Sequence, residues 1–341
     1  MNSAFSTFVV RRLLALPVIL IGITFVTFLL LHLVPGDPAR LILGEAAQDP
    51  QVVAAVRHEW GLDRPLQVQY LQYVAHLVRG DLGLSIRSRR PVSGDLARYL
   101  PATVELGAVS FAITLLLGIP LGVLSGARER TLTDHTSRVA SLLFLSMPSF
   151  WFGLIVIYVG YYVLGVLPTP TGRLGVMDVP PPAFTGLYLV DSAVAGQWGL
   201  FLRSLWHLLS PAFVLALASV GLVVRMLRAS MVEILRQDYI RTAQAKGLPP
   251  RAVFYGHALR NALIPTVTVL GIQFASLFGG NVLVETVFAW PGVGLYFVES
   301  IQWLDYAPVL GATALIAAAF VSVNLLVDVS YALLDPRIRY T

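Results

Sequence analysis

The chain has 341 residues, a net charge of +5, 56% hydrophobic residues and 13% charged ones, and its mean hydropathy is +0.74. A water-soluble core cannot bury that much apolar surface, so the composition predicts an integral membrane protein. The sequence contains no cysteine, which excludes disulfides, thiolate zinc sites and cysteine nucleophiles. The positive charge is typical of cytoplasmic loops in a multispanning protein rather than of a nucleic-acid partner.

Apolar stretches of roughly 20 residues, the length of a membrane-crossing helix, recur six times. They cover residues 9–34, 101–127, 139–165, 206–226, 263–287 and 308–331. The first stretch is too long for the core of a signal peptide and has no cleavage site, so we expect it to be retained. The sequence therefore predicts an all-α protein with six transmembrane helices.

Basic residues of the short loops gather on one side of these spans. They lie at both ends of the chain and in the loops that follow the second and fourth spans: Arg11, Arg12, Arg128, Arg130, Arg138, Arg225, Arg228, Arg236, Arg241, Lys246, Arg251, Arg260, Arg337 and Arg339. The opposite short loops hold only Arg173 and Arg203. Because basic loops stay in the cytoplasm, both termini are predicted to be cytoplasmic.

Residues 35–100 follow the first span on the outer side and carry the residues that start and stop helices. Caps, first-turn prolines and helix-ending glycines are expected at Asp37, Pro38, Asp49, Pro50, Pro65, Gly61 and Gly80. The basic and acidic residues of the segment nearly cancel, so it is expected to be a small helical cap rather than a lipid anchor.

Four segments follow from this division. Residues 1–34 form the first span with its cytoplasmic N-terminus, 35–100 the outer helical segment, 101–335 a core of five spans, and 336–341 a cytoplasmic tail. Within the core, the Pro- and Gly-rich stretch 166–205 is predicted to be an irregular outer loop with Trp198 and Trp206 as interface anchors.

Small residues recur every four positions in two spans. They are Gly118, Gly122 and Gly126 in the second span, and Gly271, Ala275 and Gly279 in the fifth. Such stripes allow close approach of helix backbones in a membrane. Packing within one subunit and packing between subunits both explain them.

The loop between the fourth and fifth spans, residues 225–265, is long and basic. Asp238 is expected to cap a helix from Tyr239 to Lys246, and Gly247 to end it in a left-handed conformation. A second helix is expected to begin at Pro250 and to run into the fifth span. Two capped helices that meet at a fixed elbow favour a docking surface over a solvated linker.

This loop resembles the EAA loop of ABC-importer permeases, in the form found in the dipeptide and oligopeptide branch. The general motif has Glu where this chain has Arg241 and Ile-x-Leu-Pro where it has residues 257–260, and these departures are typical of that branch. Further matches to its B-type permeases occur in the same order along the chain: Arg11-Arg12-Leu13, Pro35-Gly36-Asp37-Pro38, Gly80-Asp81-Leu82-Gly83, residues 101–106, Met147-Pro148, residues 285–292, residues 305–308 and Pro336-Arg337-Ile338-Arg339.

The resemblance implies a type I importer membrane domain in a bacterial inner membrane. It also implies a second homologous permease, two ATP-binding subunits, an extracytoplasmic solute-binding protein and a peptide as substrate, without a nucleic-acid partner. The expected contacts with the ATPases are Asp238, Tyr239, Arg241, Thr242, Ala243, Ala245, Lys246, Gly247, His257, Arg260 and Asn261.

No catalytic site and no cofactor are expected in this chain. Its only lysine, Lys246, is not part of a Gly-Lys-Ser/Thr phosphate-binding loop. ATP and magnesium are therefore expected in the partner ATPases. The six histidines lack metal-ligand spacing, so no metal site is predicted.

Polar residues in or near the apolar spans are candidates for the translocation path or its gate: Glu105, Gln273, Asn281, Glu285 and Asp328. For each of them a structural role is the alternative. Glu105 would lie at the interface, Glu285 would anchor the stretch after the fifth span, and Asp328 would pair near the cytoplasmic exit with Arg337 or Arg339.

Other functions remain open from the sequence. Related permeases could import nickel chelates, glutathione or haem-like solutes with the same fold. A proton-coupled secondary carrier that uses Glu105, Glu285 and Asp328 belongs to a different class, as does a receptor or scaffold without transport.

Overall fold

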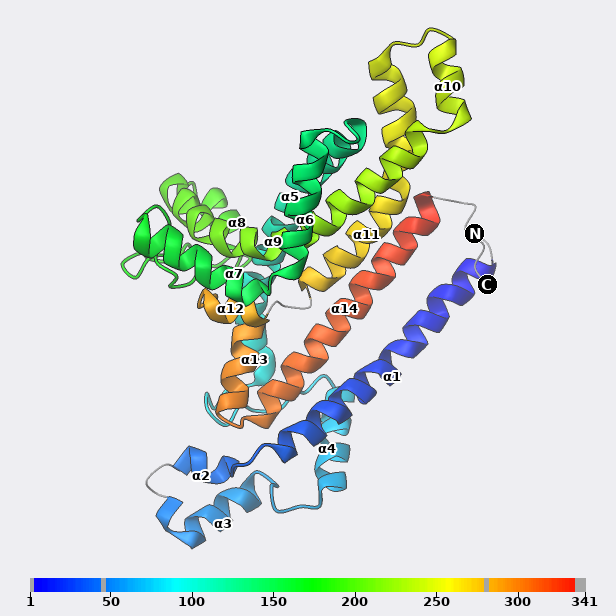
Figure 1. Cartoon of the computed structure of the whole chain (residues 1–341). Helices are drawn as coiled ribbons and strands as arrows, with labels where there is room; N and C mark the ends of the chain where they lie inside the picture. Colours follow the sequence, from blue (N-terminus) through cyan, green and yellow to red (C-terminus); the bar gives the residue numbers. More distant parts are fainter. Residues whose placement is uncertain (1–2, 44–46, 279–281, 335–341) are drawn as a thin grey trace.

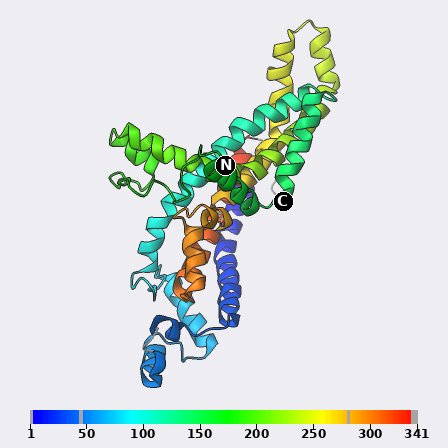
Figure 2. The ribbon, with the colours of Figure 1, turned by 60° about the vertical axis from the view of Figure 1, so that its left-hand side comes forward.

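The computed structural model describes residues 3–43, 47–278 and 282–334, and the regular elements within them are helical (Figure 1). The helices are α1 (Ser3–Leu33), α2 (Pro38–Leu43), α3 (Pro50–Glu59), α4 (Leu66–Val78), α5 (Val92–Ala127), α6 (Leu132–Ser146), α7 (Ser149–Val156), α8 (Tyr188–Val194), α9 (Trp198–Leu235), α10 (Asp238–Ala245), α11 (Arg260–Phe278), α12 (Val282–Val287), α13 (Val293–Gln302) and α14 (Tyr306–Leu334). Segments Ile157–Val163 and Ala252–Leu259 are π-helical. Figures 1 and 2 place α10 at one end of the molecule and α2, α3 and α4 at the other.

Among the described residues, five helices are long and apolar enough to cross a membrane, or six if the bent pair Leu132–Ser146 and Ser149–Val163 forms one span. The span predicted over 139–165 corresponds to this bent pair. This span begins at Leu132 and bends by 106° at its break. Pro148 disfavours the helical conformation at Met147, which is extended at φ −82° and ψ 127°.

The predicted second and fourth spans, 101–127 and 206–226, are parts of longer helices. Helix α5 begins at Val92, so the proposed domain boundary at 100/101 falls inside it, and Pro101 lies within the helix. Helices α5 and α9 contain 36 and 38 residues, whereas roughly 20 residues cross the hydrocarbon layer. Hydropathy marks only the apolar part of such a helix and misses its polar ends.

The loop prediction for 166–205 was wrong in part, because this segment contains α8 and the beginning of α9. Asp191 of α8 accepts hydrogen bonds from the backbone N–H groups of Thr185 and Gly186 at 2.9 Å each, which fixes the turn before the helix. Trp198 and Trp206 are both exposed, in the N-terminal part of α9.

The centre of the fold is the packing of α5 against α9. A Cβ atom added at Gly118, Gly122 or Gly126 of α5 would lie 3.0, 2.9 or 2.5 Å from a side chain of α9, namely Val223, Leu227 or Met231. This stripe therefore serves packing within the chain. Of the second stripe, Ala275 is buried and Gly279 lies outside the described residues.

The outer segment folds as small helices with the expected caps. Asp37 and Asp49 accept hydrogen bonds from the backbone N–H groups of Ala39 and Gln51 at 3.1 and 2.8 Å. Gly61 and Gly80 have φ values of 66° and 77°, as expected where helices end. Two tyrosines of α4 dock this segment on the long helices, since the Tyr70 hydroxyl donates to the carbonyl of Ile21 in α1 at 2.7 Å and the Tyr73 hydroxyl to that of Leu310 in α14 at 3.2 Å.

Candidate functional site

The basic loop forms two helical segments that meet at an elbow, at the α10 end of the molecule (Figure 1). The expected cap was wrong by one residue. Gln237 is the extended N-cap residue, at φ −72° and ψ 149°, and its side chain makes no capping hydrogen bond. Asp238 is the first residue of α10 and its side chain is 97% exposed. There its charge is favourable to the positive N-terminal end of the helix dipole.

Helix α10 stops where the sequence predicted. Lys246 is the C-cap residue, and Gly247 has a φ of 76°. Its N–H donates to the carbonyl of Gln244 at 2.9 Å, and the next N–H, that of Leu248, donates to the carbonyl of Ala243 at 3.4 Å. Because glycine has no Cβ, it adopts this left-handed conformation without the strain that other residues meet. The second helical segment begins at Pro250, as expected.

The inner face of the elbow is apolar. Ile240 is fully buried and Ala243 is 8% exposed; they pack in one cluster with Leu227 and Met231 of α9 and with Val253 of the following segment. Ala243, one of the expected contacts with the ATPases, is thus a packing residue of the elbow. Ile240 was not in that set, although its spacing of three from Ala243 in a polar helix marks it as core-facing.

The outer face of the elbow is polar and open to solvent. Its exposed members from the predicted set are Asp238, Tyr239, Arg241, Thr242, Ala245, Lys246, Gly247, His257, Arg260 and Asn261. The Thr242 hydroxyl donates to the carbonyl of Asp238 at 2.9 Å, and the Asn261 amide donates to that of His257 at 2.7 Å, so these two groups bond within their own helices. Tyr255, which was not predicted, is 62% exposed. Exposed aromatic and cationic side chains on a packed base suit recognition of another protein.

A buried carboxylate braces the root of the elbow. Asp134 of α6 is fully buried and accepts hydrogen bonds from the Ser125 hydroxyl of α5 at 2.7 Å and from Nη2 of Arg228 in α9 at 2.7 Å. Arg236, at the end of α9, pairs with Glu129 at 2.8 Å. These contacts join α5, α6 and α9. Sequence reasoning missed them, because no local pattern pairs residues 94 and 107 positions apart.

Glu105 lies in α5, and both of its carboxylate oxygens are hydrogen-bonded within the chain. It is 6% exposed, and one carboxylate oxygen accepts a hydrogen bond from Nη2 of Arg173 at 2.6 Å. The other accepts from the backbone N–H of Leu189 at 2.7 Å. The carboxylate therefore fastens the 173–189 segment to α5, a pairing of residues far apart in the sequence.

Glu285 of α12 is fully buried and caps another helix of the same chain. Its Oε2 atom accepts hydrogen bonds from the backbone N–H groups of Gly294 and Leu295 at 2.7 and 3.1 Å, and its Oε1 atom accepts from the Thr103 hydroxyl at 2.7 Å. The Thr103 oxygen in turn accepts from the N–H of Val293 at 2.8 Å. The first N–H groups of α13 are thus bonded. This arrangement fits the structural alternative for Glu285, in which it anchors the stretch after the fifth span.

Gln273 of α11 bridges two helices, since its amide donates to the Ser219 hydroxyl of α9 at 2.7 Å. Of the remaining path candidates, Asn281 lies outside the described residues, and so does the side chain of Asp328.

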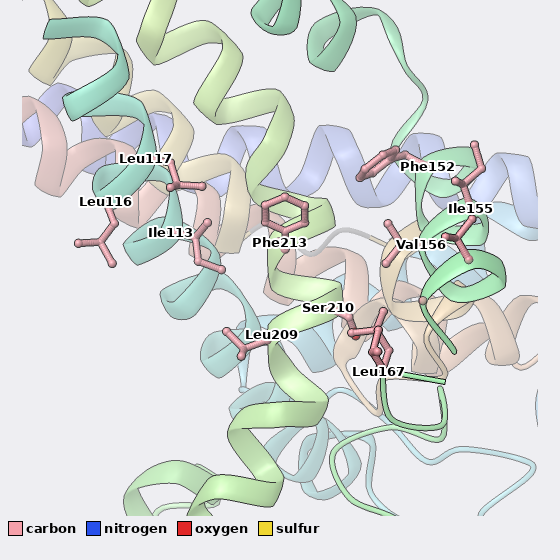
Figure 3. A pocket seen from close by; sticks show the side chains of 13 residues that line it. Ile113, Leu116, Leu117, Phe152, Ile155, Val156, Leu167, Leu209, Ser210 and Phe213 are labelled. Carbon is pink, nitrogen blue, oxygen red and sulfur yellow. The ribbon is translucent and has the colours of Figure 1, made fainter. Parts of the chain in front are cut away.

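An apolar cavity of about 710 Å³ opens between α5, α7 and α9 (Figure 3). Figure 3 shows Phe213 of α9 between Ile113 of α5 and Phe152 of α7. Its lining is aliphatic and aromatic apart from Gly160 and Ser210. Of the predicted path residues, Glu105, Gln273 and Glu285 have side chains that the structure describes, and none of these three lines it. Its chemistry suits hydrocarbon rather than the polar backbone of a peptide.

Two family models match the chain. The model described as binding-protein-dependent transport system inner membrane component matches residues 118–340, and the model for the N-terminal part of such membrane components matches residues 5–107. The probable D,D-dipeptide transport system permease protein of Escherichia coli K12 is 45% identical over 96% of each chain. The dipeptide transport system permease protein of Alkalihalophilus pseudofirmus is 41% identical over 98% of this chain and 99% of its own length. The oligopeptide transport system permease protein of Bacillus subtilis is 38% identical over 98% of this chain and 100% of its own length.

Proposed function

Because the chain belongs to the binding-protein-dependent transport system inner membrane components, we propose that it is a permease subunit of an ATP-driven importer for dipeptides and other short peptides. The relatives that cover nearly its whole length are permeases of dipeptide and oligopeptide transport systems. In this proposal the chain performs no covalent chemistry and forms the path together with a second, homologous permease.

The elbow carries the proposal for energy coupling. Its base is a closed apolar cluster, and its outer face presents tyrosines and cations to solvent. An ATPase subunit docked on that face would move α10 as one body, and α9 and α11 would transmit the motion to the membrane helices. The two ATPases supply the nucleotide and magnesium chemistry, and an extracytoplasmic binding protein delivers the peptide. Alternating exposure of the path to the two sides then follows from rigid-body motion of packed helices.

Reconstitution tests this function. The chain, its second permease, the two ATPases and the binding protein are placed in liposomes, and ATP hydrolysis and uptake of L-alanyl-L-alanine are measured. We expect the dipeptide to stimulate both, and we expect no accumulation when the ATPases are omitted. Uptake that is driven by a proton gradient through this chain alone would overturn the proposal in favour of a secondary carrier. Competition by nickel chelates, glutathione or haem, but not by dipeptides, would overturn the assignment of the solute.

A further inference from the structure

A second cavity, of about 500 Å³, lies at the outer end of the molecule and differs from the apolar one in its charge. Its lining includes the cationic side chains of Arg87, Arg90, Arg98 and Arg173 and the carboxylates of Asp95, Glu299 and Asp305; Arg87 pairs with Glu299 at 3.1 Å. Its volume falls within the roughly 300–1,000 Å³ of sites for small molecules. The lining comes from the segment before α5, the first turns of α5, the 173–188 stretch and α13 with the residues that follow it, so the cavity belongs to the outer face.

One wall carries a carboxyl group of which one oxygen has no partner among the described residues. Asp305 is 3% exposed, and its Oδ2 atom accepts hydrogen bonds from the Ser85 hydroxyl at 2.7 Å and from the backbone N–H of Arg87 at 3.1 Å. Its Oδ1 atom is buried and has no partner among the described residues. Burial raises the pKa of Asp305, and the nearby negative charge of Asp95 raises it further. A cation bound near these two carboxyl groups would favour their ionised forms.

The same cavity also contains a buried cation with an unused donor. Arg173 is 7% exposed; Nη2 donates to Glu105 and to the carbonyl of Gly186, and the guanidinium lies 3.4 Å over the ring of Tyr188. Its Nε atom is buried and has no partner among the described residues. Arg98 is exposed, and within the described part of the chain its side chain has no ion pair. Guanidinium groups are the usual donors to carboxylates.

The cavity thus brings carboxylates and guanidinium groups together in one lining, and such a lining suits a ligand that carries both charges. We propose that this cavity binds a short zwitterionic peptide, with its ammonium at Asp305 and Asp95 and its carboxylate at Arg173 and Arg98. The proposal rests on the proposed transport function and adds a peptide site on the outer face of this chain. Contacts at the two ends of the peptide leave its side chains unspecified.

Peptide binding to the purified full chain in lipid nanodiscs, without any binding protein, tests the site. Equilibrium dialysis with labelled L-alanyl-L-alanine is compared with its N-acetylated form, its C-terminal amide and inorganic phosphate. We expect saturable binding of the free dipeptide and at least tenfold weaker binding of each blocked form. Absent binding, or equal binding of the three peptide forms, would overturn the site. Competition by phosphate together with unchanged dipeptide affinity in the Asp305→Asn variant would mark a simple anion site and also overturn it.

Three variants complete the test. Asp305→Asn and Arg98→Gln are each expected to weaken dipeptide binding tenfold or more, and the second replaces an exposed side chain, so it is expected to fold. Arg79→Gln, on the exposed end of α4 and outside the cavity, is expected to leave binding unchanged. Unchanged binding in Arg98→Gln would remove the carboxylate contact from the proposal and overturn it.

The full transporter separates this inference from the function on which it rests. Dipeptide-stimulated ATP hydrolysis with no binding to the isolated chain would overturn the cavity site and leave the transport function intact. Binding to the isolated chain without stimulated hydrolysis in the complex would overturn the transport function instead.

Discussion

The two ends of this molecule are held together by different interactions. At the elbow, the buried surface is an apolar cluster whose members, apart from two residues of α9, lie close together in the sequence, and the one buried ion pair described there, Asp134 with Arg228, lies at its root. At the outer end, buried polar and charged groups pair across 68, 182 and 220 residues, through Glu105, Glu285 and Asp305. Apolar contacts are not directional, so the elbow can shift as a unit, whereas a buried charge that loses its partner is strongly destabilising. The comparison teaches that the outer end fixes the shape of the chain and the elbow suits the transmission of motion.

The largest effect is expected when the buried ion pair between Arg173 and Glu105 is broken. Arg173→Met leaves the Glu105 carboxylate buried with only a backbone donor, and we expect it to lower the free energy of unfolding by about 3–5 kcal/mol. Thermal unfolding of the purified chain in nanodiscs measures this. A second replacement, Glu105→Gln, made in the same chain is expected to recover part of the loss.

A matched control is the exposed pair of Arg203 and Asp178, whose side chains are 60% and 16% exposed. Arg203→Met is expected to cost about 0–1 kcal/mol, because solvent screens such a pair. Equal losses in Arg173→Met and Arg203→Met would contradict the distinction between a buried outer network and ordinary surface pairs.

A smaller effect is expected from Thr103→Val, which keeps the side-chain shape and removes one hydroxyl. It leaves Glu285 Oε1 and the N–H of Val293 without their partner. Each unsatisfied buried group costs about 1–3 kcal/mol, so the two groups together are expected to cost at least about 2 kcal/mol in the same unfolding measurement. Thr136→Val, at an exposed hydroxyl that bonds within its own helix, is the control. A stability equal to that of the control would mean that Glu285 does not anchor α13.

The same contrast explains what the sequence could predict. Helix stops at Gly61, Gly80 and Gly247 and the helix start at Pro250 depend on the residue itself and its neighbours, and these predictions were confirmed. The capping residue of α10 was displaced by one position, because Asp238 suits the first turn of a helix as well as its cap. The pairing of Glu105 with Arg173 has no local signal, since only the folded chain brings residues 68 positions apart together. The break at Met147 was missed because the span was judged by hydropathy, although Pro148 marked it.

The elbow is tested next, with Gly247→Val. A Cβ atom at this position would meet nothing within 4 Å, so the positive φ of 76° is the source of strain. We expect a loss of about 1–2 kcal/mol and fewer peptides imported per ATP hydrolysed in the reconstituted transporter. Gly256→Ala, whose φ is not positive and whose added Cβ also meets nothing within 4 Å, is the control. Normal coupling in Gly247→Val would argue against the elbow as the coupling element.

The smallest effect on stability is expected from replacing Arg241 and Lys246, which are proposed to contact the ATPases. Arg241 and Lys246 are exposed, and the only ion pair of Arg241 among the described residues is a 3.6 Å contact with the solvent-exposed Asp238. Replacement of both by Glu is expected to change the free energy of unfolding by less than about 0.5 kcal/mol, as is usual for surface substitutions. Association with the ATPases is expected to slow, and the difference from the wild-type chain is expected to shrink at high salt, because charges at the rim of an interface act mainly on encounter.

The control is replacement of both Arg64 and Arg79 by Glu, which changes the net charge by the same amount at the outer end. The rate of association of that variant with the ATPases is expected to stay normal. If the elbow variant and the outer variant bound the ATPases equally well, Arg241 and Lys246 would not belong to the docking surface. The exposed charges would then not explain the functional difference between the two ends.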